Sequence, residues 1–327
     1  MKKIAGINGF GRFGLHLLKY WLDRSEKSFF FIKYINDDFL TINQIIEILK
    51  KDKNVLFNKY KVQKVGNKIC LLKSNGTSYE IEYSKKEKNH IPWIGKPELF
   101  FECSGQNTAR KDCLKFLKSK TKTVIISATS WDSDETLIYG FNHHQFKKKN
   151  KIISYGSCTV NAFIPLGSFM ENNYGIIDAD VNVVHNIQEY RLKDNNTLNR
   201  KFCTLEKSGP QLLKAINKKN FKVNYTVVPY TGVSMIDFRF RIKNCPSLNR
   251  FFNTLEKATK DGDLKGLYNI HEADRGPEVH NCTPFSAVFI RENLKVINDQ
   301  VYISGYFDNE NSVNRYYDLV DYISNKI

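Results

Sequence analysis

Short apolar segments alternate with amphipathic segments along the first half of the chain. Apolar runs that predict buried strands lie at residues 2–8, 29–35, 98–103, 123–127 and 152–154. Apolar side chains at helical spacing predict helices at residues 12–23, 41–51 and 108–118. Turn signals within residues 60–84 separate shorter strands. This alternation predicts an α/β half built on a doubly wound parallel sheet.

The second half of the chain has longer stretches of β character. A helix is expected at residues 159–173, and β-type stretches follow near residues 178–188, 223–242 and 299–307. A last helix is expected from Val313 to Ile323. This half is therefore expected to be α+β, with a larger sheet.

The length of 327 residues exceeds one ordinary hydrophobic core and favours two domains. The seven cysteines are widely spaced and form no CxxC pair, which predicts neither a disulfide framework nor a metal site. A reducing cytoplasm is therefore the expected compartment. No apolar run reaches the length of a membrane span, and no signal peptide is expected before the first strand.

The net charge of +16 allows two interpretations. It could attract an anionic ligand such as a nucleotide, a sugar phosphate or a nucleic acid. It could instead belong to a solvated, lysine-rich surface. We favour the second interpretation because the lysines are dispersed along the chain and do not form a basic stripe. Nucleic acid is therefore not the expected partner.

A glycine pattern lies between the first predicted strand and the first predicted helix. It reads Gly9-Phe10-Gly11-Arg12-Phe13-Gly14, or GxGxxG. Gly9 allows a tight turn, Gly11 lets the backbone approach a pyrophosphate, and Gly14 lets the helix pack closely on the strand. The helix N-terminus then faces the phosphates. In this context the pattern predicts a dinucleotide-binding site of the Rossmann type.

An acidic residue ends the second predicted strand, where a dinucleotide fold holds the adenosine ribose. Asp37 lies there, and its carboxylate would accept hydrogen bonds from both ribose hydroxyls and repel a 2′-phosphate. The neighbouring Asp38 is a competing candidate, and both could be ordinary loop acids. The strand, the glycines and the acid together favour NAD over NADP as the cofactor.

Cys158 lies between a predicted strand and a predicted helix, so it is expected at the N-terminus of that helix. The partial positive charge there lowers the pKa of a thiol and raises its thiolate fraction. His185 lies near the end of an apolar strand and could take a proton from a reacting hydroxyl. Taken alone, the two residues are more typical of an inert buried cysteine and a hydrogen-bonded strand histidine.

Several motifs resemble, in order along nearly the whole chain, those of glyceraldehyde-3-phosphate dehydrogenases. The most specific of them is Ser157-Cys158-Thr159-Val160-Asn161. The others include Gly6-Ile7-Asn8-Gly9-Phe10-Gly11-Arg12, Asn36-Asp37, Ser127-Ala128-Thr129-Ser130, Val233-Ser234-Met235-Ile236-Asp237 and Asp308-Asn309-Glu310. The resemblance implies a dinucleotide-binding domain made of residues 1–157 with 309–327. The remaining residues, 158–308, would form an α+β catalytic domain with a mainly antiparallel sheet.

The same resemblance implies roles for the site residues. Cys158 would attack an aldehyde as a thiolate, and His185 would accept the hydroxyl proton as hydride passes to NAD. Inorganic phosphate, or water, would release the resulting thioester. Asn309 would hold the nicotinamide carboxamide, and the cofactor site would also include Ser104 and Ser127.

Two anion sites implied by the resemblance differ in how well this chain matches them. Residues that match the site for inorganic phosphate are Ser157, Thr159, Ser208 and Gly209. The site for the substrate's own phosphate is altered, because Gln188 stands at its threonine position and Val227 at its arginine position. Arg191 or Lys193, in the adjacent loop, could replace that arginine.

Glyceraldehyde 3-phosphate is the default substrate by resemblance, although the altered site predicts that it is used poorly. The alternatives are the same chemistry on erythrose 4-phosphate or on an unphosphorylated aldehyde, or a low-activity relative that binds NAD or nucleic acid. The expected partners are thus a small aldehyde and inorganic phosphate. A homo-oligomer is also expected, and the shortened segment 186–207 leaves dimer and tetramer open.

Overall fold

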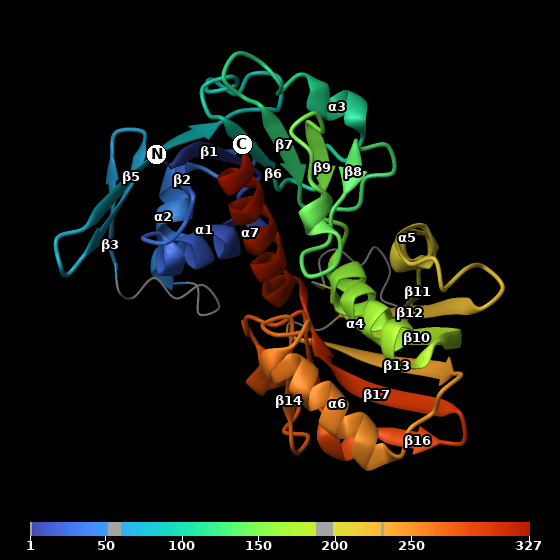
Figure 1. Cartoon of the computed structure of the whole chain (residues 1–327). Helices are drawn as coiled ribbons and strands as arrows, with labels where there is room; N and C mark the ends of the chain where they lie inside the picture. The colour runs from blue at the N-terminus through green and yellow to red at the C-terminus, as the bar shows by residue number, and fades with distance from the viewer. Residues whose placement is uncertain (1, 52–59, 188–198, 230–231) are drawn as a thin grey trace. The chain divides into compact units, whose positions relative to one another are not determined.

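The computed structural model describes residues 2–51, 60–187, 199–229 and 232–327 (Figure 1). The chain divides into two compact units, and the first comprises Met1–Gly156 together with Tyr316–Ile327. The second comprises Ser157–Arg315. Among the described residues, no helix is long and apolar enough to cross a membrane.

The first unit is built on a nine-stranded sheet. Its strands are β1 (Lys3–Asn8), β2 (Phe30–Asp37), β3 (Tyr60–Val65), β4 (Lys68–Lys73), β5 (Ser78–Lys85), β6 (Leu99–Glu102), β7 (Thr123–Ile126), β8 (Glu135–Thr136) and β9 (Ile152–Ser154). They lie in the order β3-β4-β5-β2-β1-β6-β7-β9-β8. The pairs from β5 to β8 are parallel, whereas β3, β4 and β5 pair antiparallel. The predicted parallel sheet is confirmed.

The helices of the first unit cover this sheet. They are α1 (Arg12–Arg24), α2 (Ile42–Lys51), α3 (Arg110–Leu114), the short η1 (His143–Gln145) and, from Tyr316 onward, α7 (Asn309–Lys326). α3 is shorter than the helix expected at residues 108–118. After Leu114 the chain tightens, because Phe116 and Leu117 bond to the carbonyl groups three residues back and Ser119 has a left-handed φ of 51°.

The second unit is built on an eight-stranded sheet. Its strands are β10 (Ile176–Ile187), β11 (Asn199–Arg200), β12 (Phe221–Pro229), β13 (Ser234–Ile242), β14 (Tyr268–His271), β15 (Ala287–Ile290), β16 (Lys295–Ile297) and β17 (Gln300–Phe307). Their order is β11-β12-β10-β13-β17-β15-β14, with β16 beside β17. β10, β13 and β17 pair antiparallel, whereas β12 runs parallel to β10. The predicted mainly antiparallel sheet is confirmed.

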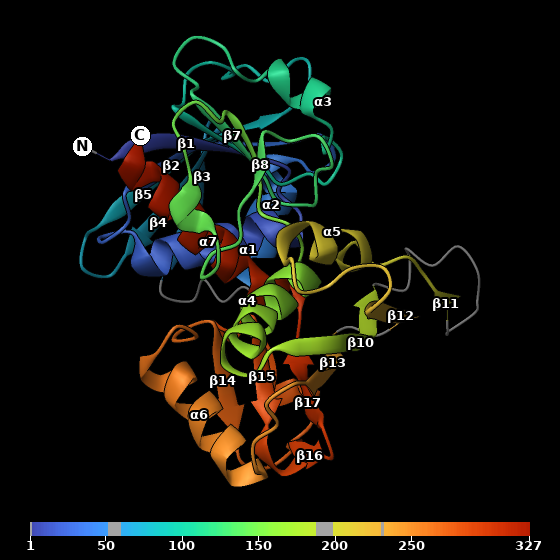
Figure 2. The same cartoon turned by 45° about the vertical axis from the view of Figure 1, so that its right-hand side comes forward.

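Helices pack against one face of this second sheet, as Figures 1 and 2 show. They are α4 (Cys158–Tyr174), α5 (Leu205–Leu212) and α6 (Leu248–Asp261), and two short helices, η3 (Pro277–His280) and η4 (Arg291–Asn293), lie in the connections. The ring of Phe163 on α4 lies 6.2 Å from that of Phe238 and 5.7 Å from that of Phe240, both on β13. The sequence analysis did not predict α6, although Phe251, Phe252 and Leu255 form its buried stripe.

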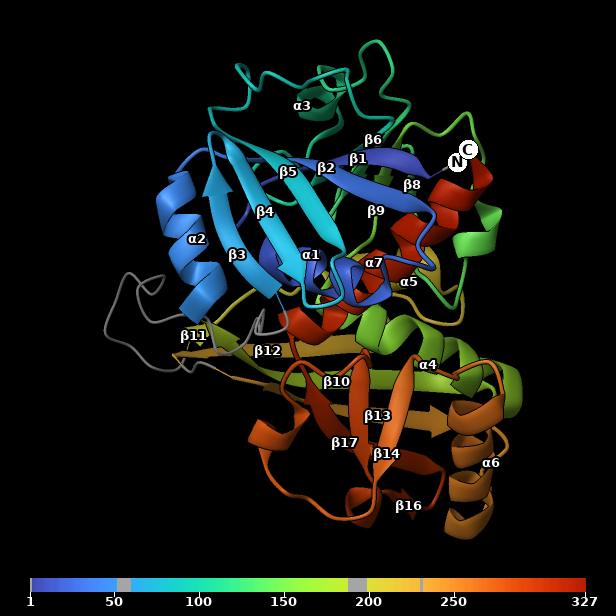
Figure 3. The same ribbon diagram turned by 90° about the vertical axis from the view of Figure 1, so that its left-hand side faces the viewer.

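Figure 3 shows the strands β3, β4 and β5 of the first unit side by side, with α2 next to β3. They form the antiparallel extension that the turn signals in residues 60–84 predicted. Gly66 and Gly76 both have left-handed backbone angles, as the turns around them require. This extension forms one edge of the sheet and joins it through β5, which pairs with β2, one of the strands β1, β2 and β6 that carry the candidate cofactor site.

Candidate active site

The glycine loop joins β1 to α1 in the first unit. Gly9 has a φ of 90°, and a Cβ atom on it would lie 2.3 Å from the Cα of Ser104. A Cβ atom on Gly14 would lie 2.4 Å from the carbonyl oxygen of Gly9, so a larger residue would push α1 away from the loop. A Cβ atom on Gly11 would meet nothing within 4 Å, which leaves the loop open to an approaching group.

The other residues of the GxGxxG pattern hold the loop in place. The backbone N–H of Phe10 donates to Asp37 Oδ2 at 2.7 Å. Arg12 is the first residue of α1. The ring of Phe13 packs edge-on against Tyr155 and Tyr316, with centroids 5.7 and 5.2 Å away. The loop and the N-terminus of α1 are therefore fixed by contacts within the first unit.

The carboxylate of Asp37 is already bonded to the backbone on two sides. Besides the bond from Phe10, Asp37 Oδ1 accepts hydrogen bonds from the N–H groups of Phe39 and Leu40 at 2.9 and 2.8 Å. A carboxylate accepts about four hydrogen bonds, so roughly one acceptor position remains on Oδ2. Asp38 is exposed, and its carboxylate accepts a bond from Gln106 Nε2 at 3.3 Å.

A buried polar network lies at the carboxyl ends of β1, β2 and β6. Asn36 Nδ2 donates to Asn8 Oδ1 at 2.9 Å, and Asn8 Nδ2 donates to Glu102 Oε2 at 2.8 Å. Burial raises the pKa of Glu102, and hydrogen bonds from Ser104 and Asn8 act in the opposite direction. The backbone N–H of Ser127 bonds to the carbonyl oxygen of Glu102 at 2.9 Å. Ser104 and Ser127 thus lie beside the sheet edge that carries the glycine loop.

Cys158 is the first residue of α4, in the second unit. Ser157 caps this helix, because its hydroxyl oxygen accepts a hydrogen bond from the N–H of Val160 at 3.3 Å. The carbonyl oxygen of Ser157 also accepts bonds from the backbone N–H and from Nδ2 of Asn161, both at 2.9 Å. The Ser-Cys-Thr-Val-Asn motif therefore sets the helix start so that the thiol lies at its N-terminus.

The structure brings His185 to Cys158. His185 Nε2 lies 3.5 Å from Cys158 Sγ, although the residues are 27 positions apart. The other ring nitrogen, Nδ1, lies 2.6 Å from the carbonyl oxygen of Asn186. A carbonyl oxygen can only accept, so Nδ1 carries the hydrogen and Nε2 of the neutral ring faces the thiol as an acceptor.

A second set of contacts fixes that carbonyl group. The backbone N–H of Asn186 donates to Ser234 Oγ at 3.0 Å, and Ser234 Oγ donates to Asn186 Oδ1 at 3.1 Å. Asn186 Nδ2 donates to the carbonyl oxygen of Gly232. Phe307 packs edge-on against the imidazole ring of His185, with centroids 5.5 Å apart. The orientation of His185 is thus set by neighbours on β10, β13 and β17.

The electrostatic environment of Cys158 differs from the expectation. Burial raises the pKa of the Cys158 thiol above its ordinary value, and the neighbouring Cys203 adds to the rise, while the backbone N–H of Thr159 opposes it. The expected lowering by the helix N-terminus was wrong, because removal from water outweighs it. This rise favours the thiol form of Cys158, whose sulfur lies 3.5 Å from His185 Nε2.

A row of hydroxyl groups lies beside Cys158. Thr204 Oγ1 donates to Ser157 Oγ at 3.0 Å, and Ser157 Oγ lies 3.1 Å from Thr159 Oγ1. The candidate phosphate residues Ser208 and Gly209 lie on α5, where the Ser208 hydroxyl donates to the carbonyl oxygen of Thr204 at 2.8 Å. Thr204, which the sequence analysis did not name, takes the position next to Ser157.

These groups surround a cavity of about 280 Å³ within the second unit. Its lining residues are Ser157, Cys158, Thr159, His185, Asn186, Ile187, Phe202, Cys203, Thr204, Tyr225, Val227 and Asn309. β10 and β12 pair in parallel with His185 opposite Val227, which places both residues at the same point of the sheet. Asn309 reaches the cavity as the first residue of α7.

Sequence reasoning missed six of the lining residues, namely Asn186, Ile187, Phe202, Cys203, Thr204 and Tyr225. No motif marks them, because they reach the cavity from the end of β10, from β12 or from the connection before α5. The candidate substrate residue Gln188 lies outside the described residues, as do Arg191 and Lys193. None of the described lining residues carries a positively charged lysine or arginine side chain.

The two units have the two-domain α/β fold of glyceraldehyde-3-phosphate dehydrogenases. Glyceraldehyde-3-phosphate dehydrogenase 4 of Caenorhabditis elegans is 27% identical over 343 residues, which cover 99% of each chain. Glyceraldehyde-3-phosphate dehydrogenase 1 of Bacillus cereus is 26% identical over 342 residues, 100% of this chain and 99% of that protein. No protein-family model matches the chain. The protein is thus a distant, full-length relative of these dehydrogenases.

Proposed function

We propose that this protein oxidises a small aldehyde with NAD, through a thioester on Cys158 that inorganic phosphate releases. The observation that carries the proposal is the 3.5 Å approach of His185 Nε2 to Cys158 Sγ at the N-terminus of α4. A nucleophile beside a base that a third group orients is the arrangement that covalent catalysis uses. The full-length similarity to dehydrogenases supports the same assignment.

The chemistry follows from the tautomer of His185. Nε2 accepts the thiol proton as Cys158 Sγ attacks the aldehyde carbon, which gives a thiohemiacetal, and the backbone N–H of Cys158 would bind its oxygen. After the imidazole has released that proton, it accepts the hydroxyl proton of the thiohemiacetal as the carbon loses hydride. NAD, when bound, supplies the hydride acceptor. The product on the protein is a thioester.

The hydroxyl row supports phosphate as the group that releases the thioester. Ser157, Thr159 and Thr204 offer three hydroxyl donors beside the sulfur, next to the N-terminal amides of α4. A phosphate oxygen would attack the acyl carbon, and Cys158 would leave as a thiolate. The direct test is NADH formation with a panel of aldehydes, with and without inorganic phosphate. A wild-type protein that reduces no NAD with any aldehyde would contradict the proposal.

Thr204→Ala is expected to raise the KM for inorganic phosphate about five- to tenfold, because one neutral hydrogen bond is lost. The first turnover of NADH without phosphate should not change, since acylation does not use this group. Ser208→Ala is the matched control, because its hydroxyl bonds within α5. A larger increase in the KM for phosphate in Ser208→Ala than in Thr204→Ala would show that phosphate binds at Ser208, as the resemblance implies.

The first unit fits NAD as the cofactor. The loop is open at Gly11, and Asp37 keeps about one acceptor position on Oδ2. This position suits one ribose hydroxyl rather than the two that the sequence suggested. A 2′-phosphate would meet the negative charge of the carboxylate, so NADP is disfavoured.

Asp37→Ala is expected to weaken NAD binding about tenfold and to narrow the difference between NAD and NADP. Dissociation constants from titration calorimetry of both nucleotides check this. Asp38→Ala is the control, because Asp38 is the competing acid and its carboxylate accepts a hydrogen bond from Gln106. If Asp38→Ala has the larger effect, or if wild-type protein uses NADP as well as NAD, the role given to Asp37 is wrong.

Val227 favours a second candidate substrate. By the resemblance, glyceraldehyde 3-phosphate is the first aldehyde to test, and its phosphate would call for a cationic partner. Val227 is 2% exposed and supplies no hydrogen bond at the position where an arginine is expected. The alternative substrate for the same reaction is therefore an aldehyde without phosphate, or erythrose 4-phosphate with its phosphate bound by other residues.

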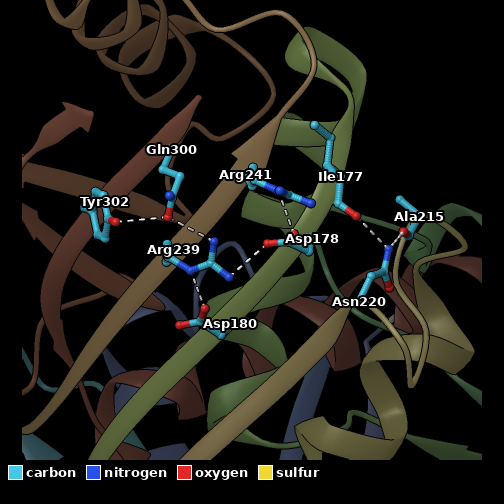
Figure 4. Close-up of polar contacts among 9 residues, drawn as sticks. All are labelled: Ile177, Asp178, Asp180, Ala215, Asn220, Arg239, Arg241, Gln300 and Tyr302. Carbon is cyan, nitrogen blue, oxygen red and sulfur yellow. Dashed lines mark hydrogen bonds and ion pairs between the residues drawn. The ribbon is translucent and has the colours of Figure 1, made fainter. Parts of the chain in front are cut away.

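We also propose that the protein is a homo-oligomer that uses the outer face of the second sheet. Because Phe238 and Phe240 point toward α4, Arg239 and Arg241 project from the opposite face, as Figure 4 shows. Arg239 bonds to Asp178 at 2.9 Å and also to Asp180, and Arg241 bonds to Asp178 at 2.8 Å. Met235, on the same side of β13, is 46% exposed.

Light scattering at micromolar concentration is expected to show a dimer or a larger assembly. Arg239→Glu should shift it toward monomer, because a third carboxylate would then face Asp178 and Asp180. Lys219→Glu, an equal charge change at an exposed turn, is the control and should leave the assembly intact. A wild-type protein that is only monomeric would refute the prediction.

A further inference from the structure

Tyr225 is the aromatic side chain of the cavity that the reaction steps above do not use. It lies on β12, lines the same cavity as Cys158 and His185, and its ring centroid lies 5.6 Å from that of His185. In the part of the chain that the structure describes, the Tyr225 hydroxyl forms no hydrogen bond. Tyr225 is half-buried, so its hydroxyl remains accessible from the cavity. It is therefore available to a ligand.

The strand β12 holds the Tyr225 side chain in the cavity that the reacting sulfur also lines. The backbone carbonyl of Tyr225 accepts a bond from Lys201 at 3.1 Å, so the strand holds the residue firmly. Burial raises the pKa of Tyr225, and the thiols of Cys158 and Cys203 add to the rise. The phenol therefore stays un-ionised across the physiological range, and it can donate one hydrogen bond to a neutral oxygen.

We infer that Tyr225 is a substrate-binding residue that donates a hydrogen bond to an uncharged oxygen on the carbon next to the aldehyde, which makes short 2-hydroxyaldehydes the preferred substrates. This inference rests on the proposed function. Val227, two residues along β12, and Ile187 make the adjoining wall apolar. A neutral donor beside an apolar wall recognises a hydroxyl group, whereas a phosphate dianion needs charge-assisted donors.

The cavity size agrees with this class of substrate. A volume of about 280 Å³ is at the small end of ligand pockets and suits a molecule of a few carbon atoms. The hydroxyl row of Ser157, Thr159 and Thr204 is the more polar wall and is used by inorganic phosphate in the proposed reaction. An organic substrate is thereby directed toward the wall that Tyr225 and Val227 form.

The experiment compares matched aldehydes in wild-type protein and in Tyr225→Phe. Lactaldehyde and propanal differ by one hydroxyl group, and glyceraldehyde and its 3-phosphate differ by the phosphate. Wild-type protein should have a kcat/KM about five- to tenfold higher for lactaldehyde than for propanal, and no preference for the phosphorylated triose. Tyr225→Phe should remove the preference for lactaldehyde, mainly through KM, and leave propanal unchanged within about twofold. Tyr322→Phe, in the first unit, is the control.

Two results would overturn the inference. If Tyr225→Phe lowers kcat/KM equally for lactaldehyde and propanal, Tyr225 only packs in the cavity wall. If the variant still prefers lactaldehyde over propanal, another group binds the hydroxyl. A second measurement is independent of turnover: hydroxyacetone should protect Cys158 from iodoacetamide better than acetone does in wild-type protein, but not in Tyr225→Phe. If this difference appears while no aldehyde is oxidised, the hydrogen bond from Tyr225 to a hydroxyl group stands as a binding contact, and the proposed function fails. If it does not appear, the inference fails whatever the activity.

Discussion

Cys158→Ser is expected to lower aldehyde oxidation by at least about 10³-fold, equivalent to roughly 4 kcal/mol of activation free energy. A serine hydroxyl is far less ionised than a thiol and forms an ester that is harder to displace. NAD binding should not change, because the glycine loop and Asp37 lie in the other unit. The measurements are steady-state NADH formation and a nucleotide titration of the same preparation.

The pH dependence of alkylation tests the electrostatic part of this prediction. Because burial raises the pKa of the Cys158 thiol, its thiolate fraction should increase with pH beyond the point at which an ordinary cysteine is fully ionised. The rate of Cys158 labelling by iodoacetamide should therefore still increase with pH where an ordinary cysteine has already reached its maximum rate. Cys245→Ser, at a half-buried cysteine far along the sheet, is the control for nonspecific labelling. Full activity in Cys158→Ser would show that Cys158 is not the nucleophile.

His185→Asn is expected to lower kcat by about 10²- to 10⁴-fold, the range that a positioned general base contributes. The asparagine side chain fits β10 but cannot accept and release a proton near neutral pH. Raising the pH should restore part of the lost rate, because the raised pKa of Cys158 means that more thiolate forms only in alkali. The measurement is the kcat–pH profile of both proteins.

A control separates loss of the base from loss of structure. His144→Asn changes a histidine of the first unit and should leave the profile unchanged. Ser234→Ala removes the hydrogen bonds between Ser234 and Asn186. It should reduce kcat by less than His185→Asn does, and its kcat–pH profile should keep the shape of the wild-type profile. If His185→Asn and wild type have the same profile, the proton goes elsewhere, and the 3.5 Å contact with Cys158 is structural.

The first unit was predictable because its signals are local. A strand, a GxGxxG pattern, a helix and an acid at the end of the next strand form a continuous stretch of the chain, and glycine is required where a Cβ atom would meet backbone 2.3 or 2.4 Å away. The parallel sheet and the mainly antiparallel second sheet were both expected from periodicity and resemblance. α6 was missed, although Ser247 caps it and its apolar stripe has helical spacing.

The sequence by itself determined the glycine loop and the position of Cys158 at a helix start, and the family resemblance implied the pairing of that cysteine with His185. Only the tertiary structure decided that Thr204 and Tyr225 join them, because the parallel pairing of β10 with β12 and the start of α5 bring together residues that no motif connects. The structure also reversed the expected pKa shift of Cys158. A helix N-terminus is a local feature that sequence can reveal, whereas burial depends on every element that packs around the sulfur.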